Sequence, residues 1–356
     1  MTPITDTAHE DADQAVVRAV SFLRARQFPH GEFATYVGAN TDMSGDLFFD
    51  SSSFFTSFVV YGLTHVHRAV GGDVLEKAVS FLRSEMEFGG LWRYWTSRQY
   101  KHCRMPPDLD DVACISYALR TTGNPVPRNR WFFASRKDPV GRYYVWAPLT
   151  WQSVRMPWYA FVRSVGAVSA RIRSRNAPVP SFDDPRLRIG RLNWNEVDPV
   201  VNANVILYLG ERPETLPAIQ YVIASVLDES SGRGLWYQER LALYHAAARA
   251  FRHSSPSLAV VREHIVERIG ELCEAPDRLN PLQMAMAASA LQTFTPTSGL
   301  LLELIRSIRD AQRTDGGWKA CPFYNLPGMF WGSEELTTGF CLEVLARAAL
   351  GPDVGD

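Results

Sequence analysis

Gln312-Arg313-Thr314-Asp315-Gly316-Gly317-Trp318 is the clearest copy of a turn that recurs along this chain with the pattern Q-x-x-x-G-x-W. Gln27 to Phe33 keeps the Gln and the Gly, with Phe in place of Trp. Met86 to Trp92 and Ser230 to Trp236 keep the Gly and the Trp, and Lys137 to Tyr143 keeps the Gly and an aromatic residue. The Gly supplies the turn, the Gln can bond free backbone groups at a helix end, and the aromatic side chain packs on the next helix. The recurrence indicates a helical repeat protein.

The segments between these turns have helical periodicity, and they form pairs. In each pair an amphipathic segment is followed by a more apolar one that is rich in small residues, such as Ala242 to Ala250 or Met284 to Ala290. Small or apolar residues on every face are typical of a helix that is buried on all sides. The predicted pairs are 11 to 27 with 50 to 67, 73 to 87 with 107 to 121, 126 to 136 with 198 to 209, 214 to 228 with 238 to 252, 257 to 273 with 281 to 295, and 298 to 312 with 333 to 349.

Six such pairs in series predict an all-α fold, a single (α/α)6 toroid, with the second helix of each pair lining the interior. Each pair can bury its apolar face only against its neighbours, and closing the ring removes the two exposed ends. We predict that this domain spans residues 11 to 350, after a disordered tail over residues 1 to 10. The irregular third pair carries an insertion at about residues 147 to 190.

The composition argues against several classes of protein. Lys and Arg (37) nearly balance Asp and Glu (38), so no overall charge favours a nucleic acid partner. The five cysteines are scattered without a C-x-x-C pair, which argues against a disulfide framework or a cysteine zinc site, and we expect no metal or other cofactor. The N-terminus is polar and acidic, unlike a targeting peptide, and no apolar run approaches the roughly 18 residues of a membrane-spanning helix. We therefore expect a cytoplasmic protein.

The acidic run Pro106-Pro107-Asp108-Leu109-Asp110-Asp111 opens the second predicted inner helix. Prolines at the start and carboxylates in the first turn suit a helix N-terminus, where the helix dipole favours negative charge. Taken alone, the run is therefore interpreted as an N-cap. Three carboxyls also suit a demanding acid catalysis, because crowding them in a cavity of low dielectric keeps at least one protonated at neutral pH.

A D-x-D-D run on an inner helix of a toroid with Q-x-x-x-G-x-W turns resembles the squalene–hopene cyclase family of class II terpene cyclases, over most of the chain. Leu326 to Gly332 looks like the family's F-P-G-x-F-Y-x-G loop, which supplies a cation-stabilising aromatic residue. Asn204 to Gly210 is similar to the segment in which the family has a histidine bonded to the catalytic acid; this sequence has Asn204 at that position.

The resemblance implies that Asp110 is the Brønsted acid and that Asp108 and Asp111 support it. Asn204 would bond the other oxygen of Asp110 and so stabilise the conjugate base. One toroid accounts for nearly all of the chain, whereas full-length members of the family have two helical domains. The chain therefore resembles the single-domain meroterpenoid cyclases of the merosterolic acid synthase type. This implies proton-initiated cyclisation of a lipophilic isoprenoid, either a prenylated aromatic compound or a C15–C20 prenyl chain.

A migrating carbocation requires a water-poor cavity with aromatic walls. Aromatic residues gather where the predicted inner helices begin, and the loops entering those helices share one end of a toroid. The predicted substrate-binding residues are Phe54, Tyr94, Trp95, Trp194, Tyr237, Tyr244, Phe323, Tyr324, Phe330 and Trp331. The basic residues that could contact a polar head group are Arg93, Arg98, Lys101, Arg104, Arg142 and Arg155. The alternative interpretation is that they form a solvated basic face.

Within the insertion, residues 148 to 175 mix aromatic and aliphatic residues with five arginines and no acidic residue. Such a segment can lie at a membrane surface and draw a lipophilic substrate from it. The same composition also fits a lid or a surface helix. Peripheral membrane contact is therefore one expectation among three.

Three other functions compete with the cyclase hypothesis. Protein prenyltransferase β-subunits are toroids that use zinc, but the D-x-C element is missing, since Asp315 is followed by two glycines. Toroidal glycosidases and polysaccharide lyases use two carboxylates across a cleft. Candidates for such a pair are Glu32, Asp46, Asp50, Glu196 and Asp198. In a non-catalytic helical-repeat binding module, the acidic run would be only a cap.

Overall fold

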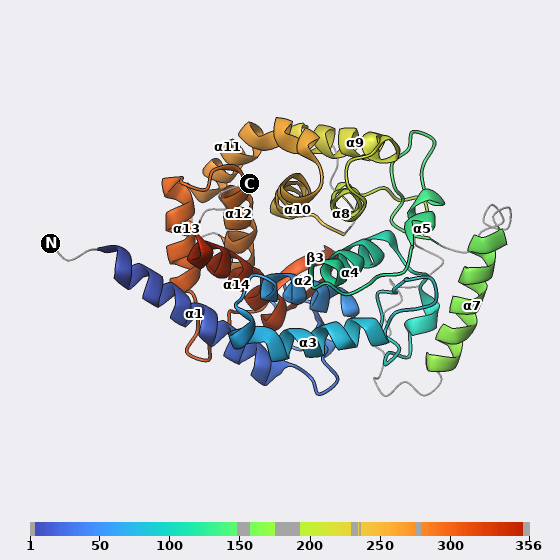
Figure 1. Cartoon of the computed structure of the whole chain (residues 1–356), viewed down its shortest axis with the longest axis horizontal. Coiled ribbons are helices and arrows are strands. Elements are labelled where there is room, and N and C mark those ends of the chain that lie inside the picture. The colour runs from blue at the N-terminus through green and yellow to red at the C-terminus, as the bar shows by residue number, and fades with distance from the viewer. Residues whose placement is uncertain are drawn as a thin grey trace.

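The computed structural model describes residues 4 to 147, 157 to 174, 193 to 228, 234, 236 to 274 and 279 to 351. Within these ranges six buried helices form a ring, because each packs on the next and the last packs on the first (Figure 1). In ring order they are α2 (Ser53–Leu63), α4 (Leu109–Thr121), α8 (Pro199–Leu209), α10 (Arg240–His253), α12 (Pro281–Phe294) and α14 (Glu334–Leu350). Nearly all their side chains are buried, as their small and apolar sequences predict.

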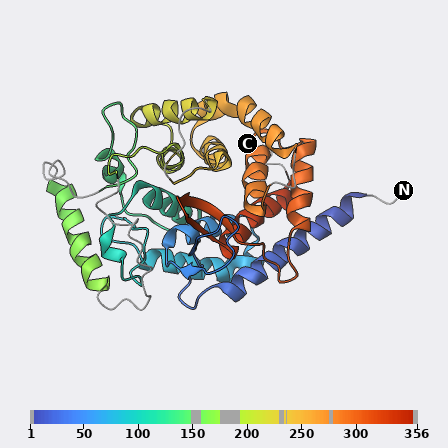
Figure 2. The same cartoon turned by 180° about the vertical axis from the view of Figure 1, so that it is seen from behind.

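Amphipathic helices lie outside this ring (Figures 1 and 2). They are α1 (Ile4–Arg26), α3 (Arg68–Ser84), α9 (Leu216–Leu227), α11 (Arg262–Cys273) and α13 (Gly299–Asp310). Shorter or separate elements are η1 (His102–Arg104), α5 (Arg130–Ala134), α7 (Pro157–Ser174), η4 (Pro213–Thr215) and η5 (Pro256–Val261). The inner and outer helices occupy the predicted ranges to within a few residues. The exception is α1, which extends over residues 4 to 10 of the predicted tail, where no Gly or Pro interrupts the helix.

The repeated turns join neighbouring outer helices. Gln312 Nε2 donates to the carbonyl of Ala15 at 2.9 Å and to that of Gly316 at 2.9 Å, which ties the end of α13 to α1. Gln27 Nε2 donates in the same way to the carbonyls of Val74 at 3.0 Å and Gly31 at 3.1 Å, which ties α1 to α3. The Gln of the repeat therefore bonds the next outer helix as well as its own turn.

Two glycines allow the first and the last inner helices to meet. A Cβ atom on Gly62 of α2 would lie 2.4 Å from the carbonyl oxygen of Gly339 of α14, and a Cβ on Gly339 would lie 3.0 Å from the Cα of Val59. Real Cβ atoms do not approach backbone atoms as closely as the first of these distances. The close packing of α2 on α14, which closes the ring, therefore requires glycine at position 62.

The all-α prediction is wrong in one respect, because the structure contains a small antiparallel sheet with the order β2-β1-β4-β3. Its strands are β1 (Tyr36–Gly38), β2 (Phe48–Phe49), β3 (Cys321–Leu326) and β4 (Met329–Ser333). β3 and β4 form a hairpin around Pro327 and Gly328, whose φ of 73° suits the third position of a type II turn. The predicted loop from Leu326 to Gly332 thus covers the last residue of β3, the hairpin turn and most of β4. Strands this short give almost no alternating pattern in the sequence.

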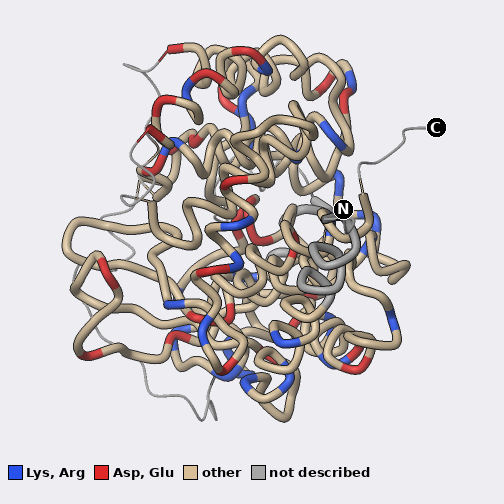
Figure 3. Tube along the Cα trace, turned by 90° about the vertical axis from the view of Figure 1, so that its left-hand side faces the viewer, with Lys and Arg blue, Asp and Glu red and all other residues tan. Residues whose placement is uncertain are grey.

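Charges of both signs are interspersed over the side of the molecule seen in Figure 3, in agreement with the near balance of 37 basic and 38 acidic residues. No helix in the part of the chain that the structure describes is both long enough and apolar enough to cross a membrane.

Candidate active site

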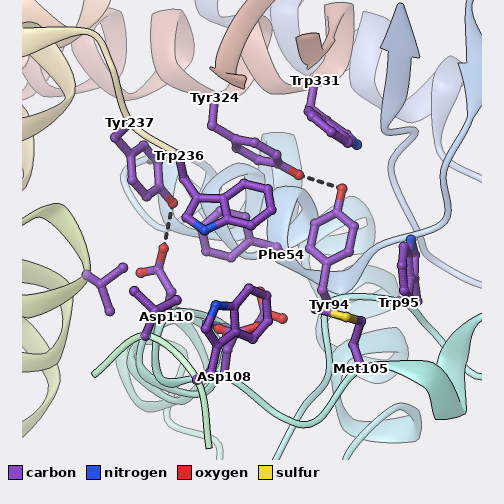
Figure 4. A pocket seen from close by; sticks show the side chains of 14 residues that line it. Phe54, Tyr94, Trp95, Met105, Asp108, Asp110, Trp236, Tyr237, Tyr324 and Trp331 are labelled. Carbon is purple, nitrogen blue, oxygen red and sulfur yellow. Dashed lines mark hydrogen bonds between the residues drawn. The ribbon is translucent and has the colours of Figure 1, made fainter. Parts of the chain in front are cut away.

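A cavity lies where the inner helices begin (Figure 4). Apart from three carboxyl groups, its walls are aromatic and aliphatic. It is lined by Phe54, Tyr94, Trp95, Met105, Asp108, Asp110, Asp111, Val145, Trp146, Val201, Trp236, Tyr237, Tyr324 and Trp331. These residues come from the starts of α2, α4, α8 and α10, from the loops that precede them, and from the β3–β4 hairpin. The helix N-termini thus bring residues distant in sequence to one chamber.

Six of the ten predicted aromatic residues line this cavity: Phe54, Tyr94, Trp95, Tyr237, Tyr324 and Trp331. Four do not. Phe323 lies behind the wall, with its ring 5.5 Å from the ring of Tyr237 and 6.4 Å from that of Phe54. Trp194 packs on the wall residue Trp146, with ring centroids 6.0 Å apart.

Phe330 and Tyr244 are placed away from the cavity for simple geometric reasons. Successive side chains of a strand point to opposite faces, so Trp331 faces the cavity and Phe330 is partly exposed on the other side. Tyr244 is buried in the interior of α10, with the guanidinium of Arg240 5.8 Å from its ring. Neither of these two residues lines the described cavity.

Five wall residues were not predicted from the sequence: Met105, Val145, Trp146, Val201 and Trp236. Val145 and Trp146 run beside the start of α4, where the amide of Leu109 donates to the carbonyl of Val145 at 2.9 Å. Trp236 is the aromatic residue of a repeated turn, which was interpreted as a packing residue only. Its position directly before Tyr237 and the start of α10 was the signal that could have identified it.

All three carboxyls of the acidic run line the cavity, but their hydrogen bonds differ. Asp108 is the N-cap of α4, and its Oδ1 accepts the amide of Asp111 at 2.7 Å. Asp110 is buried, and each of its oxygens accepts a hydrogen bond from another element. Asn204 Nδ2 donates to Oδ1 at 2.8 Å, and the hydroxyl of Tyr237 donates to Oδ2 at 2.6 Å. The structure therefore brings Asn204 to Asp110, as the resemblance implied.

Burial raises the pKa values of all three carboxyls. It raises the pKa of Asp108 to about 7, against the opposing effect of its hydrogen bonds with Asp111. The pKa of Asp111 lies well above its ordinary value because of burial and the adjacent charge of Asp108. Burial also raises the pKa of Asp110, while the hydrogen bonds from Tyr237 and Asn204 lower it. The cluster thus retains protons near neutral pH, and Asp110 has donors ready to stabilise its carboxylate.

We expect the substitution Asp111→Asn to stabilise the fold. Because the folded pKa is raised above an unfolded value of about 3.9, this carboxyl contributes stability only at low pH, and its contribution is lost as the pH rises towards the folded value. Asparagine removes that penalty. The melting temperature should rise by about 2 °C or more at pH 8 and by less at pH 5. Calorimetry at the two pH values measures this, and a larger gain at pH 5 would contradict it.

The carboxylates that could serve a sugar-cleaving enzyme have other roles. Asp50 accepts hydrogen bonds from the indoles of Trp95 at 2.8 Å and Trp331 at 3.0 Å. Asp198 caps α8 through the amide of Val200 at 2.8 Å, and Glu32 accepts the hydroxyl of Ser51 at 2.6 Å. None of the five predicted carboxylates lines the cavity described above.

Two of the arginines considered for a polar head group are held in ion pairs. Arg93 is buried and paired with Glu87, with Nε 2.5 Å from the carboxylate, and Arg142 is paired with Asp138 at 2.6 Å. Lys101 is buried against the ring of Trp95, and Arg104 lies over the ring of Tyr100. Arg155 lies outside the described residues. Arg93, Lys101 and Arg104 thus make their contacts within the segment that precedes α4.

No protein-family model matches the chain, and no curated protein matches it in sequence. Solved structures do match it in fold. The type II terpene cyclase MstE from Scytonema, in complex with geranylgeranyl dihydroxybenzoate, superimposes with a TM-score of 0.66 over 96% of this chain and 98% of that chain, at 14% identity. The chain has the fold of a type II terpene cyclase. A protein from Actinoplanes has a TM-score of 0.64 at 19% identity, over 95% of this chain and 99% of that one.

This cyclase fold agrees with the family resemblance of the sequence. An unsaturated glucuronyl hydrolase specific for heparin is also similar, but less so, with a TM-score of 0.56 at 12% identity over 96% of each chain. Structures of MstE are known with its substrate, geranylgeranyl dihydroxybenzoate, and with its product, merosterolic acid A.

Proposed function

We propose that this protein is a class II terpene cyclase in which Asp110 protonates a terminal alkene of a linear isoprenoid. The observation that carries the proposal is the setting of Asp110, a buried carboxyl at an aromatic cavity with a donor on each oxygen. The closed ring of inner helices supports an (α/α)6 toroid, with the short α5 as the outer helix of an irregular third pair.

Protonation of an alkene needs an acid that is neutral before the reaction and stable as an anion after it. Burial and the adjacent Asp108 and Asp111 favour the neutral form of the cluster. When the Asp110 O–H bond breaks and a C–H bond forms on the substrate, the donors of Asn204 and Tyr237 stabilise the carboxylate that remains. Two neutral donors thus take the place of the histidine found in the resembling family.

The aromatic walls of the cavity suit the carbocation that forms after protonation. Aromatic faces stabilise a cation by roughly 0.5 to 2 kcal/mol each. The rings of Phe54, Tyr324, Trp331 and Trp236 lie close together, with Tyr324 and Trp331 stacked at 5.4 Å. A chamber lined in this way also excludes the water that would capture the cation early.

The proposed substrate class rests on the apolar lining of the cavity and on the similarity to MstE. The apolar and aromatic walls suit a lipophilic chain, and the substrate that we propose is a prenylated aromatic compound or a C15–C20 prenyl chain. The MstE structure that matches nearly the whole length of this chain was solved in complex with geranylgeranyl dihydroxybenzoate. A sugar-cleaving function is not favoured, because no second carboxylate faces the acidic cluster across the described cavity.

The experiment that tests the proposal is an incubation of the purified protein with geranylgeranyl dihydroxybenzoate, geranylgeranyl diphosphate and squalene, each without added metal. The expected product is a cyclic isomer, equal in mass to its substrate but with fewer alkenes, from one of the two shorter substrates. Chromatography with mass and NMR spectroscopy identifies it. If none of the three is cyclised, the proposal is wrong.

We propose in addition that α7 contacts a membrane surface. Phe161, Val165, Val168 and Ile172 recur at helical spacing and are 54%, 37%, 61% and 62% exposed. α7 lies at the edge of the molecule, apart from the ring (Figure 1), and its last turn carries Arg171 and Arg173. An apolar stripe beside basic residues is typical of helices that lie in the interface of an anionic bilayer.

We therefore expect the protein to sediment with vesicles of anionic phospholipid, and Val168→Asp with Ile172→Asp to reduce the bound fraction about tenfold by placing charge in the apolar stripe. Val140→Asp, at a residue that is 63% exposed outside α7, is the matched control and should bind as the wild type does. Equal binding of the α7 variant and the wild type would contradict membrane contact through this helix.

A further inference from the structure

A second buried carboxylate, Asp50, lies directly behind the aromatic wall at the residues that precede α2. Its Oδ1 accepts the indole of Trp95 at 2.8 Å and the amide of Gln99 at 3.2 Å. Its Oδ2 accepts the indole of Trp331 at 3.0 Å and the hydroxyl of Tyr94 at 3.2 Å. Asp50 is only 3% exposed and does not itself line the cavity.

These contacts fit an ionised carboxylate. The two indoles and the side-chain amide nitrogen of Gln99 can only donate. The hydroxyl of Tyr94 also donates to Asp50, because it already accepts a hydrogen bond from the hydroxyl of Tyr324 at 2.5 Å. A protonated Asp50 would place its hydrogen among donors. In this arrangement Asp50 is therefore the final acceptor in a chain of hydrogen bonds.

The chain of hydrogen bonds starts at the cavity surface. Tyr324 and Tyr94 both line the cavity, and Figure 4 shows their hydroxyls meeting beside it. Each hydroxyl donates inwards, from Tyr324 to Tyr94 and from Tyr94 to Asp50. The oxygen of Tyr324 thus keeps lone pairs for a proton from the cavity, and the chain ends on a base that no substrate can touch. Its geometry is that of a path for a proton leaving the cavity.

We infer that cyclisation ends by deprotonation through the relay Tyr324–Tyr94–Asp50. This inference rests on the proposed cyclase function and assigns the terminating base. A C–H bond next to the final cation breaks, and its electron pair forms the product alkene. The proton goes to the oxygen of Tyr324, the proton of Tyr324 goes to Tyr94, and that of Tyr94 goes to Asp50. Both tyrosines end neutral, Asp50 ends as a carboxylic acid, and it returns the proton to water after the product leaves.

Two further observations support termination of the reaction by deprotonation. The cavity walls away from the acidic cluster are almost wholly apolar, so a resident nucleophilic water has few partners there. Burial raises the pKa of Asp50, which makes its carboxylate a stronger base than an exposed one. The proton therefore enters from Asp110 at the start of α4 and leaves towards Asp50 before α2.

The test uses tyrosine variants that keep the aromatic ring and remove the relay. Tyr324→Phe and Tyr94→Phe are compared with the wild type on the substrate that the wild type cyclises, with product profiles measured by chromatography and mass spectrometry. We expect the ratio of misterminated products, alkene isomers and water adducts 18 Da heavier, to rise about tenfold, because the proton acceptor is lost. The product profile is expressed per substrate consumed, so that a change in the overall rate of either variant does not enter the comparison.

Two controls separate proton transfer from packing. Tyr221→Phe removes a tyrosine hydroxyl on α9, away from the cavity, and should leave the profile unchanged. Gln99→Met removes one hydrogen bond to Asp50 outside the relay, and should shift the profile much less than Tyr94→Phe does. Circular dichroism melts confirm that each variant is folded. Asp50→Asn is a second route to the same result, with the same misterminated products expected.

Wild-type product profiles from both Tyr324→Phe and Tyr94→Phe would overturn the relay and leave the cyclase proposal standing. An equal shift in Gln99→Met would also overturn it, since packing around Asp50 would then explain the change. A wild-type protein that forms no cyclic product would overturn the cyclase function, and the relay with it.

Discussion

Replacing Asp110 with asparagine is expected to abolish cyclisation, with kcat falling about 1,000-fold or more, because general acid catalysis by a positioned group contributes up to this order. The amide keeps the size and most of the hydrogen bonding of the carboxyl but has no proton acidic enough for an alkene. Asp110 is the member of the cluster whose two oxygens are bonded by Tyr237 and Asn204, from different elements. The rate of product formation under saturating substrate measures the loss.

Three matched variants test whether the loss is specific to the acid. Asp108→Asn preserves an N-cap side chain for α4 and should retain more activity than Asp110→Asn does. Asn204→Leu and Tyr237→Phe each remove one donor to Asp110 and should lower kcat about 10- to 100-fold, since one hydrogen bond to a developing charge contributes roughly 1.5 to 3 kcal/mol. Full activity in Asp110→Asn would show that another group donates the proton.

Gly62→Ala is expected to destabilise the protein by about 3 kcal/mol, although alanine normally stabilises a helix interior. The added Cβ would lie 2.4 Å from the carbonyl oxygen of Gly339, so α2 and α14 must separate where the ring closes. Backbone atoms of two packed helices cannot yield as a flexible side chain can. Chemical denaturation of the purified variant measures the change in the free energy of unfolding.

Gly270→Ala is the matched control, since Gly270 lies within α11 and a Cβ there would meet nothing within 4 Å. This variant should be more stable than the wild type by about 0.5 to 1 kcal/mol, the difference in helix propensity. The two substitutions are chemically identical and differ only in what surrounds the new methyl group. Similar effects in both variants would contradict the close contact at the α2–α14 junction.

The helices could be predicted because their sequences repeat one physical pattern. A turn with Gly and an aromatic residue ends an amphipathic segment, and an apolar segment such as α12 follows. The small sheet could not be predicted, because β1 and β2 are only three and two residues long, and β1 pairs with β4, almost 300 residues away in the sequence. Such pairing depends on the closed ring, which brings the two ends of the chain together.

The residues that line the cavity were only partly predicted from the sequence. The run at Asp108 to Asp111 is both a cap and an acidic cluster, so neither interpretation of the sequence was complete without the other. Trp331 and Phe330 were indistinguishable in the sequence, and the strand geometry of β4 separates them. Asp50 was considered only as half of a sugar-cleaving pair, because nothing local indicates that two indoles converge on it.

The central claim is that a proton from a carboxyl of this protein starts a cyclisation, and deuterium labelling tests it most directly. The wild type is incubated with geranylgeranyl dihydroxybenzoate in D2O without added metal, after its exchangeable protons have been replaced. The predicted result is a cyclic product that carries a single deuterium, at the protonated carbon of the former terminal alkene. Asp110→Asn is predicted to form no such product. A cyclic product without deuterium at that carbon would contradict proton initiation.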